Sequence, residues 1–440
     1  MSPTIKRIDS DARLPAEADV IVIGGGIVGA AAAYFLAKRG RSVALLEKGV
    51  VGGEQSSRNW GWCRQQNRDA RELPLAIRSM ELWDALAGEI GEDLGFRRCG
   101  LVYATNDAAQ IAQWERWRET AKQFGVETRL LTGPEASAMT AGTGREWLGG
   151  VHSFTDGKAE PALAAPVLAL GARKHGATVH QGCAARGLDV SNGAVTGVVT
   201  EKGVIRTQSV ILSGGAWASG FCRHHGIVFP QASVRATSLR TEIAPAWLEA
   251  FYTPEIALTR RLDGSYTIAI SGKATLELTP QGLRYARQFM PMFLKRLKAV
   301  EFGIGSSFFN GPEALGSWSL DKETPFERIR VLDPAPSRRA MATLLERAHA
   351  LVPALRNVAV RESWGAYIDS TPDAVPVISP TIGLNGLVLA AGLSGHGFGL
   401  GPGAGHLAAD LATGDTPIVD PRPFRHARLL DGSQGEVGEF

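Results

Sequence analysis

The stretch that most constrains the fold is DVIVIGGGIVGAAAAYFLAKRGRSVALLE, residues 19–47 of the 440-residue chain. Its first five residues, Asp19–Ile23, are mostly β-branched and lack a helical period, which predicts a buried parallel strand. A GxGxxG pattern follows at once. Gly24 permits the tight turn, Gly26 lets the backbone approach a pyrophosphate, and Gly29 lets the next helix pack closely on the sheet.

The residues after the glycines complete the pattern. The alanine-rich segment Ala30–Lys38 predicts a helix whose N-terminal N–H groups face that pyrophosphate. Gly40 ends this helix, and Ser42–Leu46 predict a second strand that brings Glu47 to its carboxyl end, where a ribose hydroxyl pair is held. A glycine-rich turn without a ligand is the alternative. Strand, glycines, helix, strand and acid in this register favour a dinucleotide site.

Composition limits the class of protein. A chain of 440 residues favours two domains, and 44% hydrophobic with 21% charged residues indicates an ordinary globular protein. The net charge of +3 gives no indication of a nucleic-acid partner. We expect no metal site, because the cysteines have no CxxC or histidine spacing, and we expect reduced thiols in a cytoplasmic protein. We also expect no secretory signal and no membrane span, with a peripheral contact at the inner membrane left open.

Several segments together resemble one family. These are VIVIGGGIVGAAAAYFLAKRG with VALLEKG, then DGKAEP and ILSGGAW, and finally STPDAVPVI with LAAGLSGHGFGLGPGAG. In this order they resemble the D-amino acid oxidase (DAO) family of FAD-dependent oxidoreductases, which includes glycine oxidase, sarcosine oxidases and bacterial D-amino acid dehydrogenases. An NAD-dependent enzyme with the same fingerprint is disfavoured, because a C-terminal glycine-rich strand and turn that return to the first site are a flavoprotein arrangement.

The resemblance implies an α/β fold with two domains. A Rossmann-like FAD-binding domain would be discontinuous and comprise residues 1–95, 150–228 and 337–440. A second, α+β substrate-binding domain would comprise residues 96–149 and 229–336, built on an antiparallel sheet that the alternating tracts after Phe229 also indicate. In that region LRYARQFMPMFLKRLKAV, residues 283–300, predicts one helix.

The resemblance also implies noncovalent FAD, since no Cys or His stands where covalent relatives attach the ring and Cys63 reads as a plain buried thiol. Ala184 or Ala185 would meet the adenine through the backbone. The expected cofactor-binding residues are Gly24, Gly26, Ile27, Val28, Gly29, Glu47, Lys48, Gln55, Ser56, Ser57, Asn59, Ala185, Gly214, Gly215, Trp217, Gly392, Gly395, His396, Gly397, Phe398 and Gly399.

One departure from the family bears on the substrate. Many relatives that use amino acids have an arginine before the TPD segment that clamps the substrate carboxylate, but this chain reads YIDSTPD, with Ile368 and Asp369 there. Arg64 is the favoured replacement, because its loop is nearest the flavin. The other arginines considered are Arg68, Arg240 and Arg261.

Three further side chains are candidates for the chemistry. His396 lies in a glycine turn at a helix start, where contact with the flavin is expected rather than proton abstraction. Tyr266, like Tyr367, can orient substrate, with a hydrogen-bonded core tyrosine as the alternative. Lys273 loosely matches the lysine that sarcosine oxidases place over the flavin to activate oxygen, with a surface lysine as the alternative.

The function that the resemblance implies is oxidation of the C–N bond of an amino acid or secondary amine. Substrates would include a D-amino acid, an N-methyl or a cyclic imino acid, and hydride transfer to flavin N5 would give an imine. Oxygen or a quinone or other electron carrier would reoxidise the flavin. The alternatives are an oxidase of an amine without a carboxylate, and a noncatalytic flavoprotein or a flavoprotein subunit that needs a partner for electron transfer.

Overall fold

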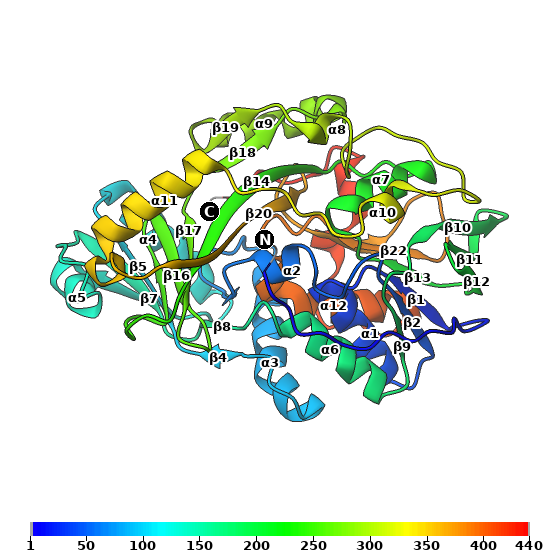
Figure 1. Cartoon of the computed structure of the whole chain (residues 1–440), viewed down its shortest axis with the longest axis horizontal. Coiled ribbons are helices and arrows are strands. Elements are labelled where there is room, and N and C mark those ends of the chain that lie inside the picture. The colour runs from blue at the N-terminus through cyan, green and yellow to red at the C-terminus, as the bar shows by residue number, and fades with distance from the viewer. Residues whose placement is uncertain (1–2, 439–440) are drawn as a thin grey trace.

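The computed structural model describes residues 3–438, in which two large sheets lie side by side with helices and two smaller sheets around them (Figure 1). The first sheet holds the fingerprint. Its strands are parallel except for the antiparallel edge strand β21. Their order is β21 (Val377–Pro380), β22 (Leu387–Ala391), β13 (Val210–Leu212), β1 (Val20–Ile23), β2 (Val43–Leu46) and β9 (Thr178–His180). The predicted Rossmann-like order of strand, helix and strand from 19 to 47 is therefore confirmed.

Helices cover one face of this sheet. The apolar sides of α1 (Ile27–Lys38) are buried almost completely, because α6 (Ala164–Lys174) and α12 (Gly397–Thr413) flank it and the sheet lies beneath. The long helix α3 (Leu73–Ile90) packs against α12. The other face is covered by the antiparallel strands β10 (Ala185–Ser191), β11 (Ala194–Thr200) and β12 (Gly203–Arg206), with α7 (Ala218–His224) beside them.

The second sheet is mostly antiparallel and lies beside the first (Figure 1). Its order is β19 (Val300–Gly303), β18 (Ala274–Glu277), β14 (Ala232–Thr241), β17 (Tyr266–Ile270), β16 (Ile256–Arg260), β15 (Ala250–Tyr252), β5 (Leu101–Thr105), β7 (Gly149–Ser153) and β6 (Arg129–Thr132). The strand β20 (Val360–Ser370) also pairs with β14. Helix α11 (Arg338–Leu351) buries its apolar side on this sheet, and α4 (Ala108–Lys122) and α5 (Gly133–Met139) lie at its far end.

Short elements link the two sheets. The segment after Glu47 contains α2 (Gln55–Arg58) and β3 (Trp62–Cys63). The strand β8 (Gly157–Lys158) pairs with β3 on one side and with β4 (Arg97–Arg98) on the other. A further single turn, α10 (Pro325–Arg328), precedes α11. These short elements connect the two sheets near the end of the first sheet where the glycine turn lies.

Two features differ from the sequence-based expectation. Residues 283–300 are not one helix: α8 (Pro280–Arg284) and α9 (Ala286–Arg296) are separate, and a strand, β19, begins at Val300 because it pairs with β18. The expected boundaries at 150 and 337 also do not follow the sheets. Strand β7 pairs with β5, and β20 pairs with β14 from Ala232↔Ser370 to Thr241↔Val360. We therefore propose that residues 149–153 and 338–370 belong to the substrate-binding domain.

Two searches of residues 3–438 concern membranes and metals. Within this range, no helix combines the length and the apolar character that crossing a bilayer requires. The same residues contain no cluster of three or more His, Cys, Asp or Glu side chains placed to hold a metal ion. The four cysteines are all free thiols.

The tight packing of α1 on β1 leads to a test. A Cβ on Gly29 would lie 1.9 Å from the Gly24 carbonyl oxygen, whereas a Cβ on Gly88, inside α3, would meet nothing within 4 Å. We expect Gly29→Ala to destabilise the protein by about 3 kcal/mol through overpacking. Gly88→Ala is the matched control and should stabilise by about 0.5–1 kcal/mol. Thermal denaturation measures both, and equal melting temperatures of the two variants would contradict the packing assigned to Gly29.

Candidate active site

A cavity of about 880 Å³ runs between the two sheets. It begins at the glycine turn after β1, passes the ends of β2 and β13, and continues under β14, β18 and β20. Ligand-binding cavities occur at the carboxyl ends of parallel strands and at domain interfaces, and this one lies at both. One end is therefore shaped by the first sheet and the other by the second.

The glycine turn forms the first wall of the cavity. Gly24 has φ +105°, and a Cβ there would lie 2.4 Å from the Ser213 carbonyl oxygen, so only glycine fits this turn. Gly26 lines the cavity, and a Cβ there would meet only the Ser56 hydroxyl, at 3.2 Å. The Ile27 N–H donates to that hydroxyl over 2.8 Å. The open backbone at the start of α1 is the surface on which a pyrophosphate is held.

Glu47 stands at the end of β2 in a fixed orientation. Its carboxylate accepts the Gly25 N–H at 2.8 Å and the Gly49 N–H at 2.7 Å. Burial raises the pKa of this carboxyl, while the neighbouring Lys48 lowers it. The residue lines the cavity beside Gly24 and Gly26. An oriented acid at this place fits the hydroxyl groups of an adenosine ribose.

Trp217 and Lys48 form the wall next to Glu47. The Lys48 ammonium lies 4.6 Å from the centre of the Trp217 ring and 2.6 Å from Glu54 Oε1. Trp217 is 5% exposed, and its indole Nε1 has no hydrogen-bond partner among residues 3–438. Of the two alanines considered for adenine contact, Ala185 lines the cavity, whereas the Ala184 N–H donates to Glu201. A polar ligand bound in the cavity would supply the acceptor that this buried N–H lacks.

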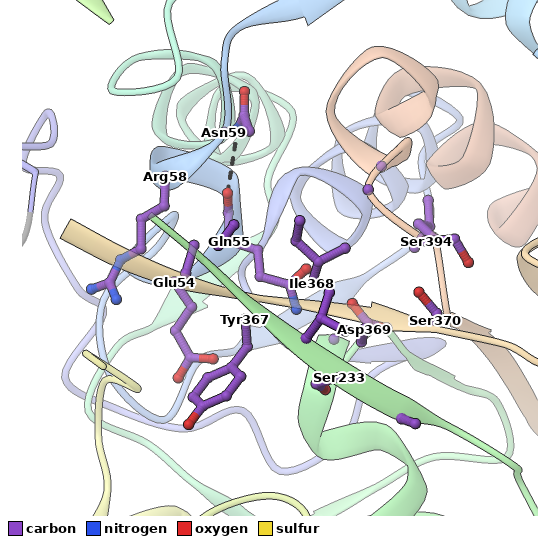
Figure 2. A pocket seen from close by; sticks show the side chains of 18 of the residues that line it. Glu54, Gln55, Arg58, Asn59, Ser233, Tyr367, Ile368, Asp369, Ser370 and Ser394 are labelled. Carbon is purple, nitrogen blue, oxygen red and sulfur yellow. Dashed lines mark hydrogen bonds between the residues drawn. The ribbon is translucent and has the colours of Figure 1, made fainter. Parts of the chain in front are cut away.

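Asp369 joins the two sheets across the middle of the cavity. It lies on β20, and its Oδ2 accepts from Gln231 Nε2 at 2.6 Å and from the Gly392 N–H at 2.9 Å. Gln231 also donates to the Gly215 carbonyl at 2.9 Å. Figure 2 shows Asp369 beside Gln55, whose side chain helps to hold the carboxylate, although burial is the larger effect and raises its pKa. Asp369 thus fixes two loops that follow strands β22 and β13 of the first sheet.

Aromatic side chains line the part of the cavity next to the second sheet. We call this part the chamber. It is formed by Trp62, Tyr103 and Tyr252 from β3, β5 and β15, with Arg64 beside them. The rings of Trp62 and Tyr103 are 6.1 Å apart, and those of Tyr103 and Tyr252 are 5.4 Å apart. The Arg64 guanidinium lies 5.6 Å from the Trp62 ring and donates to the Tyr103 hydroxyl at 3.3 Å. This part of the cavity is therefore lined by aromatic rings and carries the positive charge of Arg64 over one of them.

A buried pair of titratable groups lies at the floor of the cavity. His396 Nδ1 is 2.9 Å from Glu72 Oε2, and both side chains are buried. Burial raises the pKa of Glu72 to about 8 and holds the pKa of His396 well below its usual range. Burial therefore favours the uncharged form of each of the two groups. His396 lines the cavity and Glu72 lies behind it.

Most of the expected cofactor-binding residues line this cavity. Four do not: Gly29, Ser57, Gly392 and Gly399. Gly29 packs on Gly24, and the Ser57 hydroxyl bonds the Glu54 carbonyl. Gly392 donates to Asp369, and the Gly399 carbonyl accepts from Ser79 and Trp83 of α3. These four shape the cavity walls from behind. The lining members are Gly24, Gly26, Ile27, Val28, Glu47, Lys48, Gln55, Ser56, Asn59, Ala185, Gly214, Gly215, Trp217, Gly395, His396, Gly397 and Phe398.

Of the side chains considered for the chemistry, Arg64, His396 and Lys273 line the cavity and Tyr266 does not. Tyr266 is buried inside the second sheet, where its hydroxyl accepts the Trp247 N–H at 2.8 Å. It is the hydrogen-bonded core tyrosine that was the alternative, so we no longer assign it a role with the substrate. Lys273 is exposed at the cavity edge.

The four arginines considered as anchors for a substrate carboxylate fall into two groups. Arg64 and Arg68 line the cavity. Arg240 bonds Glu362 at 2.9 Å and also pairs with Asp263, and Arg261 pairs with Glu160. Neither Arg240 nor Arg261 lines the cavity, so each takes part in an ion pair outside the site. Tyr367 lines it, but its hydroxyl bonds Glu277 at 2.7 Å.

Several residues of the site were not singled out from the sequence as part of it. Glu72 meets His396 across 324 positions of the chain, and Gln231 meets Asp369 across 138. Tyr103 and Tyr252 come from strands that pair in parallel only in the folded second sheet. No local motif marks such residues, because their role depends on which strands become neighbours.

Comparisons with known proteins agree with this geometry. The family model described as "DAO: FAD dependent oxidoreductase" matches residues 19–411. The chain is also similar to the structure of an L-amino acid deaminase from Proteus myxofaciens, solved in complex with anthranilate. The TM-score is 0.92 and the identity 31%, and the match covers 97% of each chain.

Two curated relatives extend the comparison. A 4-methylaminobutanoate oxidase (formaldehyde-forming) from Paenarthrobacter nicotinovorans is 26% identical over 412 residues, which are 92% of this chain but 45% of that protein. This chain therefore spans less than half of that relative. A sarcosine oxidase subunit beta from Arthrobacter sp is 25% identical over 422 residues, covering 94% of this chain and 91% of that one.

The bonds of Asp369 lead to a test of cofactor binding. Asp369→Ala removes the acceptor that fixes Gly392 and Gln231 and should weaken FAD binding by roughly 10- to 100-fold, because bonds to a buried carboxylate are lost. Asp369→Asn, which keeps one acceptor, should lose less. The matched control is Asp321→Ala, an exposed acid. FAD affinity measured by fluorescence titration decides, and unchanged affinity in Asp369→Ala would contradict the role assigned to it.

The buried pair predicts a pH dependence. The pKa of Glu72 is raised in the folded state, so between the usual carboxyl range and pH about 8 the folded protein binds more protons than the unfolded one. Its contribution to stability therefore falls as pH rises through that window. Glu72→Gln lacks this loss, so the difference in melting temperature, variant minus wild type, should increase from pH 5 to pH 8. With exposed Glu119→Gln as control the difference should stay constant, and a constant difference in both variants would contradict the raised pKa.

Proposed function

We propose an activity for this chain on the basis of its family. The chain belongs to the DAO family of FAD-dependent oxidoreductases. FAD, when bound, supplies the acceptor for two electrons. We propose that the chain oxidises the C–N bond of an amino acid or secondary amine to an imine, which water then hydrolyses. The substrate would lie in the part of the cavity that Trp62, Tyr103, Tyr252 and Arg64 line.

The observation that carries this proposal is the continuity of the cavity. The same hollow is lined by the glycine turn and Glu47 at one end and by Arg64 with the aromatic rings at the other. The donors and walls of the first end fit FAD, with Gly26 open to a pyrophosphate, Glu47 oriented for a ribose and Trp217 Nε1 without a partner among residues 3–438. The other end is left for a small molecule.

The chamber residues would bind and orient that molecule. The rings of Trp62, Tyr103 and Tyr252 exclude water, which keeps the amine dehydrated and in contact with the protein. His396 presents an uncharged imidazole, because burial holds its pKa low. A neutral floor does not repel the neutral amine that oxidation requires, so we assign His396 a positioning role in this chamber.

The relatives support the reaction class. The proteins in the comparison are named for amino acids or methylated amines: an L-amino acid deaminase, a 4-methylaminobutanoate oxidase and a sarcosine oxidase subunit. The name of the last one also favours the second candidate, a flavoprotein subunit that passes electrons to a partner. An amine without a carboxylate is the third, because Asp369 stands where relatives have an arginine. The acceptor is oxygen or a quinone or other electron carrier.

We further propose that the protein acts in the cytoplasm, or in peripheral contact with the inner membrane. The support is its set of four free cysteines, which is typical of a reducing compartment. The net charge of +3 gives no reason to add nucleic acid as a partner.

Anaerobic mixing tests the reaction. Purified FAD-loaded protein is mixed with D- and L-amino acids, N-methyl amino acids, cyclic imino acids and simple amines, and loss of the oxidised flavin absorbance is followed. We expect one class to reduce the flavin, and recovery with oxygen or with a quinone then identifies the acceptor. If the flavin is present and no amine reduces it, the proposed reaction is contradicted and the partner-dependent subunit takes its place.

A further inference from the structure

The segment between α10 and α11 crosses from the first sheet to the second (Figure 1). Phe326 of α10 packs in the core of the first sheet, whereas Leu344 of α11 packs in the core of the second. Between these helices, residues 329–332 have no regular secondary structure and run along the loop that follows β2. We call these four residues the strap. Its Arg330 and Val331 line the cavity.

Hydrogen bonds fasten the strap to the loop after β2. The Lys48 ammonium donates to the Ile329 carbonyl at 2.7 Å and to the Arg330 carbonyl at 3.2 Å. At the other end of the strap, the Leu332 N–H donates to Glu54 Oε1 at 2.9 Å. Lys48 and Glu54 also pair with each other at 2.6 Å. One ion pair of the loop therefore holds the strap at both of its ends.

The Arg330 side chain extends these connections to a second loop. Its guanidinium donates to the Lys48 carbonyl at 3.1 Å and pairs with Glu201, with Nη2 2.6 Å from Oε2. Glu201 in turn accepts the Ala184 N–H at 2.6 Å, and the next residue, Ala185, lines the cavity. The guanidinium therefore joins the two loops that carry the expected ribose and adenine contacts.

The strap lies directly on the loop that follows Glu47. A Cβ on Gly49 would lie 2.1 Å from the Arg330 carbonyl oxygen and 3.0 Å from Val331 Cγ2. A Cβ on Gly53 would lie 3.6 Å from the same Val331 atom. A gap that does not admit one carbon atom at Gly49 does not let a dinucleotide pass. The cavity is therefore closed on this side, beside the acid that is oriented for a ribose.

We propose that the strap encloses the adenosine half of FAD and that Arg330 is a cofactor-binding residue in addition to those expected from the sequence. FAD then enters and leaves when the strap is detached from Lys48 and Glu54. A planar guanidinium suits this place, because it packs well against an aromatic ring such as adenine and carries the charge that a pyrophosphate attracts. The inference concerns the cofactor and does not depend on which substrate the protein oxidises.

Ligands that share one half of FAD test this assignment. ADP contains the adenosine half and FMN the flavin half. Wild type, Arg330→Met and Arg330→Lys are freed of FAD, shown to rebind it, and titrated with FAD, ADP and FMN. We expect Arg330→Met to bind FAD and ADP roughly 10-fold more weakly, because the bonds that fasten the strap are lost, and Arg330→Lys to be intermediate. FMN should bind all three proteins equally. Arg356→Met, the same change at an exposed arginine, is the matched control and should bind every ligand as wild type does.

Release of FAD from the loaded protein is the second measurement. After dilution, flavin fluorescence should rise roughly 10-fold faster in Arg330→Met than in wild type. Unchanged ADP affinity or an unchanged release rate in this variant overturns the inference. An equal loss of FMN and ADP affinity also overturns it, because the strap then acts through the fold as a whole. If Arg330→Met does not fold, Arg330→Lys decides by the same comparisons. None of these outcomes involves flavin reduction by an amine, so the proposed reaction stands or fails separately.

Discussion

The structure depends on one buried carboxylate that belongs to the second sheet and holds loops of the first. Asp369 lies on β20, yet it bonds Gly392 directly and reaches the Gly215 carbonyl through Gln231. These loops follow β22 and β13, at the end of the first sheet where α1 begins. Strand β20 also pairs with β14 along its length. The second sheet is therefore fixed to these loops of the first sheet.

Local patterns were sufficient to predict the first domain and insufficient for the second. The fold of the segment from Val20 to Glu47 can be predicted from its sequence, because the glycine spacing, the helix and the acid all depend on residues that are close in sequence. The second sheet is assembled from distant strands, so local patterns did not reveal that β20 pairs with β14, and residues 283–300 were taken as a single helix. Tyr266 shows the same limit: its strand was correct, but only the folded sheet shows which face the ring occupies.

The electrostatics of the cavity change along its length. Near the glycine turn an oriented acid, Glu47, and helix N–H groups suit the ribose and pyrophosphate of a dinucleotide. At the floor the Glu72–His396 pair is neutral, since burial raises one pKa and lowers the other. In the chamber Arg64 and Arg68 leave excess positive charge among aromatic rings. A single hollow thus presents surfaces of different charge along its length.

The central claim is that this hollow holds FAD at one end and leaves the chamber free for substrate. The crystal structure of the FAD-loaded protein tests it most directly. We expect the cofactor to extend from Glu47 toward His396, and the cavity surface formed by Trp62, Tyr103 and Arg64 to remain uncovered by it. A cofactor that occupies the chamber itself, or that lies outside this cavity, would contradict the account.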